Sequence, residues 1–477
     1  MATSPDPESQ KPEPQLNSPH NADTDEETSS KPQPPTGYDL PLWRKCLILF
    51  VVSWMTLAVT FSSTSLLPAT PEIAGDFSTT TEILNVINAG VLIAMGFSSF
   101  LWGPLTDLFG RRNAYNAAIT VLCACSAGTA AAINLHMFIA MRLLSGFTGT
   151  FFMVAGQTII ADIFKPVVRG TATGFMMVGS VSGPAIGPCI GGIIVTFAHW
   201  RIIYWLQLGM VSLGLALSLL FVPSIQRTGQ AVAPRQPINL SLVLHMFNPL
   251  RIFRPFIYPN VFLSHLTCGL LATFQYAILT SARSIFNPRF HLTTPLVSGL
   301  FYLSPGIGFL IGSVMGGKLS DRAVKRWIQK RNGVRLPQDR LNSGLVTLFV
   351  VLPASTLIYS WTLQEGVGGM AVPIISAFTA GIGLLGTFNG LNTYSAEVMP
   401  HIRSEVISGK YVVQYIFAAS ATAAVEPLIN SIGVGWTFTI CVAFAIIGGF
   451  FVLAITKWGI DMQRGVEEKF GIDAKPS

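Results

Sequence analysis

Long apolar segments separated by short polar loops run through most of this chain of 477 residues. A helix needs about 20 mainly apolar residues to cross the hydrocarbon core of a bilayer. The pattern predicts twelve transmembrane helices, six on each side of a polar stretch. The first six are expected at about 45–68, 83–104, 113–133, 136–160, 171–197 and 201–223. The second six are expected at about 256–283, 295–317, 341–361, 367–391, 405–429 and 433–456.

This spacing predicts an all-α membrane protein made of two six-helix bundles, residues 42–223 and 256–457. Residues 224–255 between them are expected to be a cytosolic basic linker, and residues 458–477 a cytosolic C-terminal tail. Residues 1–41 differ in kind, because they hold two lysines against eight acidic residues and many prolines and serines. Such a composition cannot bury a core, so we expect a disordered acidic tail, either passive or phosphorylated.

Composition narrows the class of protein. Only 11% of the residues are charged, against roughly a quarter in soluble proteins, so most of the surface must face lipid. The chain has no Walker-type phosphate loop, and we find no metal-ligand spacing and no nucleophile–base arrangement. The sequence therefore favours a transporter over an enzyme, with no cofactor, no metal and no nucleic-acid partner, driven by an ion or substrate gradient.

Basic residues orient the predicted helices, since short cytosolic loops are rich in Lys and Arg. The stretch 318–340 holds eight basic residues against two acidic ones, whereas the stretch 71–82 on the opposite side holds acids only. Arg283 and Arg289 are exceptions on the outer side. The trend predicts that both termini are cytosolic.

A short motif occurs twice, as GPLTDLFGRR (103–112) and GKLSDR (317–322), each time just after an even-numbered predicted helix. This repeat indicates two duplicated halves. An acid followed by arginines in such a loop can make charge-assisted bonds and cap a helix of the other half, as a latch. For the arginines of the first copy, the alternative is that they only satisfy the positive-inside rule. The residues of this expected cytosolic gate are Asp107, Arg111, Arg112, Asp321 and Arg322.

The fifth predicted helix, 171–197, carries a stripe of small residues and two prolines. Such a stripe allows close helix packing, and we expect its partner to be the eighth predicted helix, from the other half. Pro184 and Pro188 each remove an amide donor, so we expect a kinked, close-packed seam between the halves. The alternative is a merely bent structural helix. The stripe consists of Gly179, Gly183, Gly187 and Gly191.

Three motifs over residues 42–457 resemble the major facilitator superfamily, in particular its fungal-type, twelve-spanning drug:proton antiporter branch. They are GPLTDLFGRR, in which Leu108 departs from the family's usual basic residue, RLLSGFTG (142–149), and a pattern in the fifth helix. The resemblance implies an alternating-access transporter and, for the fifth helix, an antiporter motif. That motif comprises Gly174, Gly183, Pro184, Gly187, Pro188, Gly191 and Gly192.

Ionisable side chains inside the predicted helices are the candidate substrate or proton-coupling residues, because such groups are costly in a bilayer. The resemblance assigns Arg142 to proton coupling or substrate contact, and it leads us to expect Asn where Lys410 stands. Both cations could instead snorkel to the membrane surface. His265 could carry a proton or could serve only in packing. The neutral candidates are Gln157, Tyr276, Asn389 and Gln414.

Two cations facing one cavity would attract an organic anion. We therefore expect a proton-coupled secondary transporter that exports a small organic acid, such as the di- or tricarboxylates itaconate and citrate, or an acidic secondary metabolite. The alternatives are a multidrug or lipophilic-cation:proton antiporter and a non-transporting sensor. The expected partners are a small-molecule substrate, protons and the lipid bilayer, for a monomeric multi-pass protein of the plasma membrane. Glu397 is expected to join Arg403 in a cytosolic gating network.

Overall fold

The computed structural model describes residues 40–221, 247–291 and 299–470. These residues belong to one compact unit, Thr36–Ser477. All regular secondary structure within the described ranges is helical, as the hydrophobic pattern predicts. The expected acidic tail and most of the basic linker lie outside the described residues.

The N-terminal helices, α1 to α8, precede residue 222. They are α1 (Leu42–Thr64), α2 (Thr70–Asp76), α3 (Thr81–Phe109), α4 (Arg111–Ala130), α5 (Leu135–Gly146), α6 (Gly149–Ile163), α7 (Arg169–Phe197) and α8 (Arg201–Phe221). The C-terminal helices are α10 (Leu250–Phe253), α11 (Pro259–Phe290), α13 (Leu303–Lys330), α14 (Leu352–Glu365), α15 (Ala371–Glu397) and α16 (Arg403–Phe470). Short 3-10 and π segments link them: Leu67–Ala69, Arg254–Ile257, Pro337–Gly344 (η4), Thr347–Val351 and Pro400–Ile402.

Ten helical segments are long and apolar enough to cross a membrane, within the ranges that the structure describes. The sequence predicts twelve, and the difference has two causes. Helix α4 begins with Arg111 and Arg112 and is too polar to be counted. The last two predicted helices are joined in α16, whose 68 residues would span roughly 100 Å if straight, far more than a bilayer. Gly433 interrupts α16 with a non-helical backbone conformation, φ 84° and ψ 168°.

Local sequence sets where several helices begin. The Thr80 hydroxyl accepts a hydrogen bond from the backbone amide of Ile83 (3.4 Å), and the Asn134 side chain accepts one from Met137 (2.8 Å). These contacts satisfy amide donors at the starts of α3 and α5. Gly110 has a φ of 82° and separates α3 from α4, a conformation that glycine adopts without a steric penalty.

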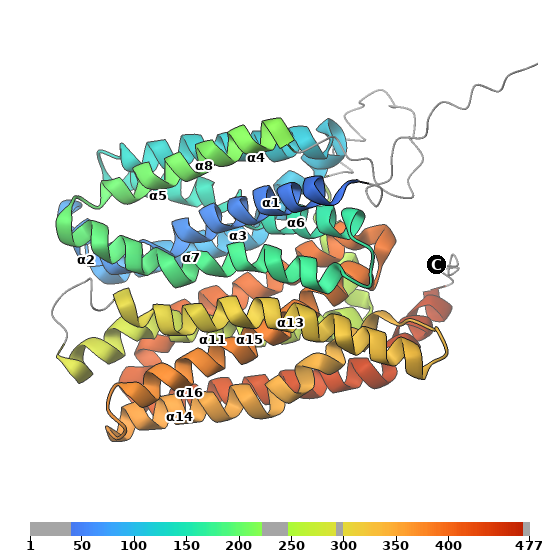
Figure 1. Cartoon of the computed structure of the whole chain (residues 1–477). Helices are drawn as coiled ribbons and strands as arrows, with labels where there is room; N and C mark the ends of the chain where they lie inside the picture. The colour runs from blue at the N-terminus through green and yellow to red at the C-terminus, as the bar shows by residue number, and fades with distance from the viewer. Residues whose placement is uncertain (1–39, 222–246, 292–298, 471–477) are drawn as a thin grey trace, which may run out of the picture. The chain divides into compact units, whose positions relative to one another are not determined.

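The helices lie side by side, and most contacts stay within the N-terminal or the C-terminal group (Figure 1). Helix α1 packs on α7 and α4 packs on α8, while α11 packs on α16 and α13 packs on α15. Two long contacts join the groups, α7 with α13 and α3 with α16. These two seams hold the candidate functional site between them.

The glycine stripe of α7 packs against α1, and the predicted packing of the stripe on the eighth predicted helix, α13, is wrong. A Cβ atom on Gly179 would lie 1.9 Å from the carbonyl oxygen of Ser53, and one on Gly191 would lie 2.2 Å from that of Ser65. Glycines at every fourth position indicate a helix face that packs closely, but they do not indicate which neighbouring helix covers that face.

A different face of α7 meets α13. A Cβ on Gly174 would lie 2.6 Å from the carbonyl oxygen of Ser313, and a Cβ on Gly306 would lie 2.4 Å from the Cβ atom of Ala185. Pro184 and Pro188 both lie inside α7, which is one helix from Arg169 to Phe197. Helices α7 and α13 therefore do pack against each other between the two groups, but the residues in contact are not those of the predicted glycine stripe.

Candidate functional site

Lys410 of α16 is completely buried, with an exposed fraction of 0%. Its ammonium group donates a hydrogen bond to Oδ1 of Asn392 and lies 3.4 Å from the centre of the Tyr411 ring. Asn392 in turn donates to the sulfur of Met177 (3.4 Å), which lies on α7. Lys410 is thus held by an amide and by an aromatic face, a cation–π contact.

A central cavity lies beside these residues, between the N-terminal and C-terminal helices. Its volume is about 30 Å³, enough for a water molecule or two but not for an organic substrate. Its lining combines polar and aromatic side chains from α7, α11, α15 and α16. Among the predicted site residues, Pro184, Tyr276 and Gln414 line it, as do Asn392 and Tyr411, the two contacts of Lys410.

Gln157 ties the two helix groups together next to this cavity. Its side-chain amide donates a hydrogen bond of 2.6 Å to the hydroxyl of Tyr411. Asn389, in contrast, faces the α7–α13 seam, where its side chain donates to the carbonyl oxygen of Ser313 (2.9 Å). The structure therefore brings Gln157, but not Asn389, to the surroundings of Lys410.

Arg142 of α5 lies in a separate buried site among the N-terminal helices. Its guanidinium donates to the carbonyl and hydroxyl oxygens of Ser62 (3.0 Å each) and to Asn88 (3.4 Å). It also lies 5.7 Å from the centre of the Tyr204 ring. These contacts have no member in common with those of Lys410, so the two predicted cations occupy different environments.

His265 of α11 is buried at 0% exposure and packs edge-on against Phe256, with ring centres 5.2 Å apart. A Cβ on Gly409 would lie 3.4 Å from its Cε1 atom, so the imidazole adjoins the backbone next to Lys410. Phe256 and Gly409 both belong to the C-terminal group. The ring is therefore a close neighbour of Lys410, but it is not among the residues that line the central cavity.

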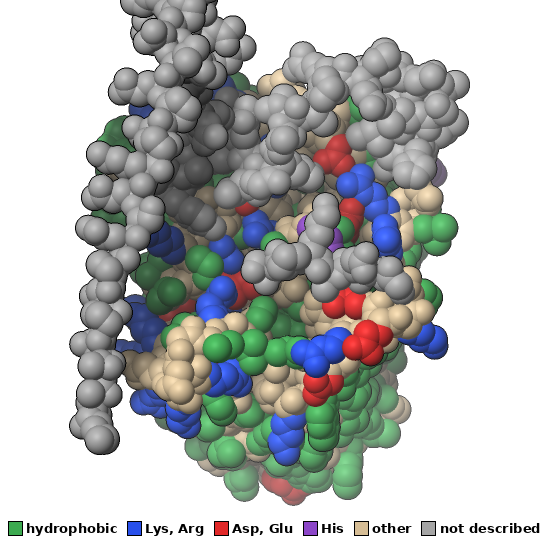
Figure 2. Space-filling view, turned by 90° about the vertical axis from the view of Figure 1, so that its right-hand side faces the viewer, with side chains coloured by type: hydrophobic (Ala, Val, Ile, Leu, Met, Phe, Trp, Pro, Cys, Tyr) green, Lys and Arg blue, Asp and Glu red, His purple; other side chains and the backbone are tan. Residues whose placement is uncertain are grey.

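Charged side chains gather at one end of the helices (Figure 2), and the most buried of them surround Glu397. The Glu397 carboxylate accepts hydrogen bonds from Arg340 (2.8 and 2.9 Å) and from Arg169 (3.1 Å). Arg335 also pairs with it. Arg169 begins α7 while Glu397 ends α15, so this cluster joins the two groups of helices. Arg403, which we expect in the same gating network as Glu397, does not pair with Glu397 directly.

Arg403 pairs instead with Asp162, at the end of α6. Its guanidinium lies 2.8 Å from one carboxylate oxygen of Asp162, and that of Arg111 lies 2.5 Å from the other. Arg111 and Asp162 come from the N-terminal group and Arg403 from the C-terminal group. Asp162 is therefore a second ionic connection between the groups.

Asp321 of the second motif copy caps α7 across the seam. It accepts hydrogen bonds from the backbone amides of Gly170 (3.1 Å) and Thr171 (2.8 Å) and from Arg340 (2.8 Å). A carboxylate at this position also interacts favourably with the helix dipole. Arg322, the other predicted gate residue of this copy, is exposed.

The charged residues of the first motif copy, 103–112, have other partners than those of the second copy. Asp107 forms an ion pair of 2.9 Å with Arg251, which also pairs with Glu405 at the start of α16. Burial by itself lowers the pKa of Arg251, but its hydrogen bonds and charge contacts with Glu405 and Asp107 outweigh burial and raise the pKa above its usual value. Arg112 donates to the carbonyl oxygen of Leu219 (2.8 Å) and so braces α4 against α8.

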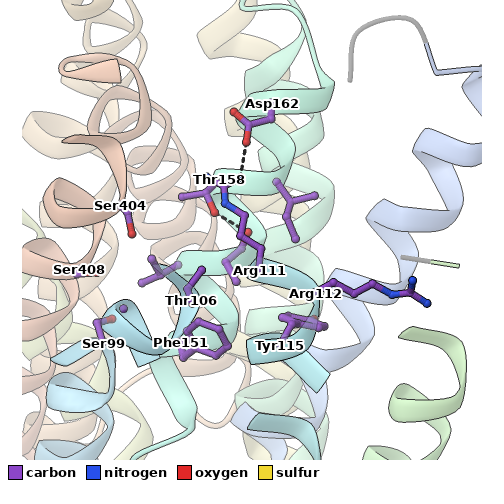
Figure 3. A pocket seen from close by; sticks show the side chains of 14 residues that line it. Ser99, Thr106, Arg111, Arg112, Tyr115, Phe151, Thr158, Asp162, Ser404 and Ser408 are labelled. Atoms are coloured by element: carbon purple, nitrogen blue, oxygen red, sulfur yellow. Dashed lines mark hydrogen bonds and ion pairs between the residues drawn. The ribbon is translucent and has the colours of Figure 1, made fainter. Parts of the chain in front are cut away.

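A cavity opens at this charged end, and we call it the vestibule. Its outer part has a volume of about 350 Å³ and includes Asp107, Arg251 and Glu405. Its inner part, of about 50 Å³, is shown in Figure 3. There, side chains of α3 and α4 face Ser404 and Ser408 of α16, while Arg112 points away.

The comparisons with known proteins settle the family. The sequence model of the Major Facilitator Superfamily matches residues 52–421. The chain belongs to the Major Facilitator Superfamily. It is a multi-pass membrane transporter by family, and its relatives and fold are those of transporters and not of enzymes.

Curated fungal relatives in this superfamily are distant. The chain is 29% identical to the MFS transporter fsa7 of a Fusarium species (86% of this chain, 84% of the relative). It is 23% identical to the MFS antiporter QDR3 of Candida albicans (88% and 79%) and 25% identical to the efflux pump radE of Floropilus chiversii (83% and 76%).

Two solved structures share the fold. The proton:xylose symporter XylE has a TM-score of 0.67 at 13% identity, with 87% of this chain and 96% of that chain covered. The human organic anion transporter MFSD10 has a TM-score of 0.61 at 15% identity, with 87% and 100% covered. At these identities the likeness concerns the fold alone.

Glu397 and Arg403 were expected in a gating network, but three other charged residues of these ion-pair clusters were not predicted: Asp162, Arg169 and Arg340. The sequence contains a repeated pattern that could have pointed to the residues of these loops. ADIFKPVVR (161–169) and AEVMPHIR (396–403) both contain alanine, an acid, a proline and a closing arginine. This second internal repeat marks equivalent positions in the two halves, and its residues form the ionic connections of the charged end.

Proposed function

We propose that this transporter is a proton-coupled exporter of an organic acid that works by alternating access. The observation that carries the proposal is Lys410, a fully buried lysine beside the central cavity. A charged lysine inside a membrane protein is costly unless an anion accompanies it. Asn392 and Tyr411, which its ammonium group contacts, carry no negative charge. A substrate carboxylate would supply the missing charge.

The same reasoning links substrate binding to protons. With no substrate in the cavity, Lys410 is less costly in its neutral form, and with a carboxylate bound it is less costly as an ammonium ion. Binding of the acid and protonation of Lys410 therefore favour each other. His265 beside Gly409 offers a second titratable group near this point.

We further propose twelve membrane crossings and cytosolic termini. Helix α4, with 20 residues, and the two parts of α16 on either side of Gly433 would complete the ten apolar segments. The basic residues of the charged end support a cytosolic position for it, since Lys165, Arg322, Lys325 and Lys330 are exposed there. The ion pairs of Asp162 and Glu397 would then close the cytosolic side, and their separation would open it.

Transport into inside-out vesicles with an imposed pH gradient tests the proposal. A panel of labelled mono-, di- and tricarboxylates is compared with a lipophilic cationic dye. We expect uptake of at least one carboxylate and its loss in Lys410→Met, with normal uptake in the matched control Lys325→Met, whose lysine is exposed on α13. Carboxylate uptake that survives Lys410→Met would contradict the proposal.

A multidrug or lipophilic-cation antiporter is the second candidate. It is favoured by the aromatic and methionine side chains around the central cavity, including Tyr276, Phe388 and Met177, and by relatives named as an antiporter and an efflux pump. Uptake of the dye with no carboxylate uptake would establish this candidate instead. The positive charge of Lys410 argues against a permanently cationic substrate.

A further inference from the structure

Two buried hydroxyl groups of the inner vestibule have no hydrogen-bond partner among the described residues, Ser99 Oγ and Tyr115 Oη. Ser99 is 3% exposed and Tyr115 is 1% exposed, and both line the cavity. Buried polar groups are almost always paired, so an unpaired one calls for an explanation. Two such groups in the same cavity are explained if a ligand atom accepts their hydrogen bonds.

The ion-pair cluster of Asp162, at the edge of the inner vestibule, has one positive charge in excess. Arg111 extends along the cavity towards Asp162 (Figure 3), and Arg403 holds the other oxygen of the same carboxylate. Two guanidinium groups therefore share one carboxylate. A guanidinium group has several N–H donors, and a second carboxylate beside Arg111 would restore the balance of charge.

The lining of the outer vestibule holds three arginines, Arg111, Arg251 and Arg403, against three acids, Asp107, Asp162 and Glu405. Within it, the guanidinium of Arg251 lies between the carboxylates of Asp107 and Glu405, so this cluster has one negative charge in excess. A ligand with one acidic group can place it at Arg111 without meeting these carboxylates. A ligand with two or three acidic groups would bring like charges together in the outer part, which is unfavourable.

Apolar side chains complete the inner lining: Phe151, Val154 and Ile159 of α6. From these features we infer that the vestibule is a loading site for monocarboxylic acids with an apolar or aromatic body. The carboxylate binds Arg111, and a polar atom of the ligand enters the inner part, of about 50 Å³, and accepts from Ser99 and Tyr115. The body of the acid is too large for the inner part and extends into the outer part, of about 350 Å³. This inference rests on the proposed function and narrows its substrate class, since it excludes di- and tricarboxylates such as citrate.

The path from the vestibule to the central cavity follows α16. Ser404 and Ser408 line the vestibule, and Tyr411 and Gln414, on the next turns, line the central cavity. The hydrogen bond from Gln157 to Tyr411 marks the boundary. On the proposed route, this contact would have to open before a loaded acid reaches Lys410.

Binding to the full chain in lipid nanodiscs tests the inference, with 6-methoxy-2-naphthoate as the probe and isothermal titration calorimetry as the measurement. The probe has one carboxylate, an aromatic body and an ether oxygen that can accept a hydrogen bond. We expect Tyr115→Phe to weaken binding about 2- to 10-fold, as the loss of one hydrogen bond does. Arg111→Gln should weaken it by more than about 10-fold, because its bond is charge-assisted.

Tyr359→Phe is the matched control, because Tyr359 is equally buried, also has an unpaired hydroxyl and lies in the C-terminal group. It should leave the affinity unchanged. The neutral amide of the probe should bind much more weakly, and citrate should not displace the probe. Since Arg111 also holds Asp162, Ser99→Ala provides a second mild variant that should weaken binding without loss of folded protein.

Three results would overturn the inference: no saturable binding at millimolar probe, an affinity that Tyr115→Phe and Ser99→Ala both leave within twofold, or displacement by citrate. The proposed function fails separately. If binding behaves as expected but vesicles take up no carboxylate, the loading site stands and acid export is wrong. If vesicles take up the probe with the same KM in Tyr115→Phe, acid export stands and the loading site is wrong.

Discussion

Replacing Glu397 by glutamine should destabilise this transporter more than any other removal of a single negative charge at the charged end. The side chain of Glu397 is 2% exposed, and that of its partner Arg340 is 0% exposed. Glutamine has the same shape but no charge, and its amide nitrogen cannot accept a hydrogen bond. In Glu397→Gln, the buried guanidinium groups of Arg340 and Arg169 would lose their common counter-charge.

The size of the effect follows from this burial. Removing one partner of a buried ion pair costs about 3–5 kcal/mol, because an uncompensated charge stays behind. Asp321 also bonds to Arg340 (2.8 Å) and compensates part of that charge, so we expect a value near the lower end, about 3 kcal/mol. An exposed pair is worth only about 0–1 kcal/mol.

Glu405→Gln is the matched control, because it removes the same charge from a pair whose arginine, Arg251, has a side chain that is 42% exposed. The assay is unfolding of the purified full chain in mixed micelles of increasing SDS content, followed by tryptophan fluorescence. We expect a loss of about 3 kcal/mol in the free energy of unfolding for Glu397→Gln and of less than about 1 kcal/mol for Glu405→Gln.

Equal losses in the two variants would refute the reasoning, because burial would then not decide the strength of these pairs. A small loss in both would mean that water reaches the Glu397 cluster. A second check uses Arg340→Met, which removes the buried cation from the same cluster. If burial of unpaired charge is the cause, adding Arg340→Met to Glu397→Gln should recover part of the lost stability, since one uncompensated cation is gone.

Two further predictions concern the packing of α7 and the hydrogen bond between Gln157 and Tyr411. Gly179→Val should reduce the yield of folded protein sharply, because its Cβ would lie 1.9 Å from the carbonyl oxygen of Ser53. Gly209→Val on α8 is the control and should express normally, because no atom lies within 4 Å of its Cβ. Size-exclusion chromatography measures the yield of both variants. Tyr411→Phe removes the hydrogen bond from Gln157. It should lower the free energy of unfolding by about 0.5–1.5 kcal/mol plus the penalty for an unpaired amide. An SDS-unfolding curve that matches that of the unmodified chain would show that this bond contributes nothing.

The fold could be predicted from the sequence to a large extent because lipid leaves few alternatives. A backbone in hydrocarbon must satisfy its own hydrogen bonds, so apolar segments of sufficient length become helices. The hydrophobic pattern predicts a loop between the last two helices, just before Gly433. In the structure, helix α16 continues through these residues, and only the backbone conformation of Gly433 interrupts it. The pattern also could not show which helix covers the glycines of α7, because a small-residue face fits either neighbour.

The site could be predicted residue by residue only in part. Lys410 and Gln157 do not line the central cavity themselves, but they contact Asn392 and Tyr411, which do. Arg142 donates instead to Ser62 and Asn88, away from this cavity, and its Nε has no hydrogen-bond partner among the described residues. Both are buried cations in apolar helices, so the sequence presents them alike. Only the three-dimensional neighbours show that Lys410 contacts residues of the central cavity and that Arg142 does not.

If the two groups of helices separate as proposed, the two repeated loops, 161–169 and 396–403, would lower the cost of breaking the ion pairs between them. Arg169 donates to the carbonyl oxygen of Ala161 (2.8 Å), and Arg403 donates to that of Ala396 (2.8 Å). Each arginine is thus fixed beside the acid of its own loop, although its ion pair is with the acid of the other loop. Separation of the two groups of helices would leave Asp162 next to Arg169 and Glu397 next to Arg403. Each charge would then exchange one partner for another, so the desolvated charges are never all left unpaired at once.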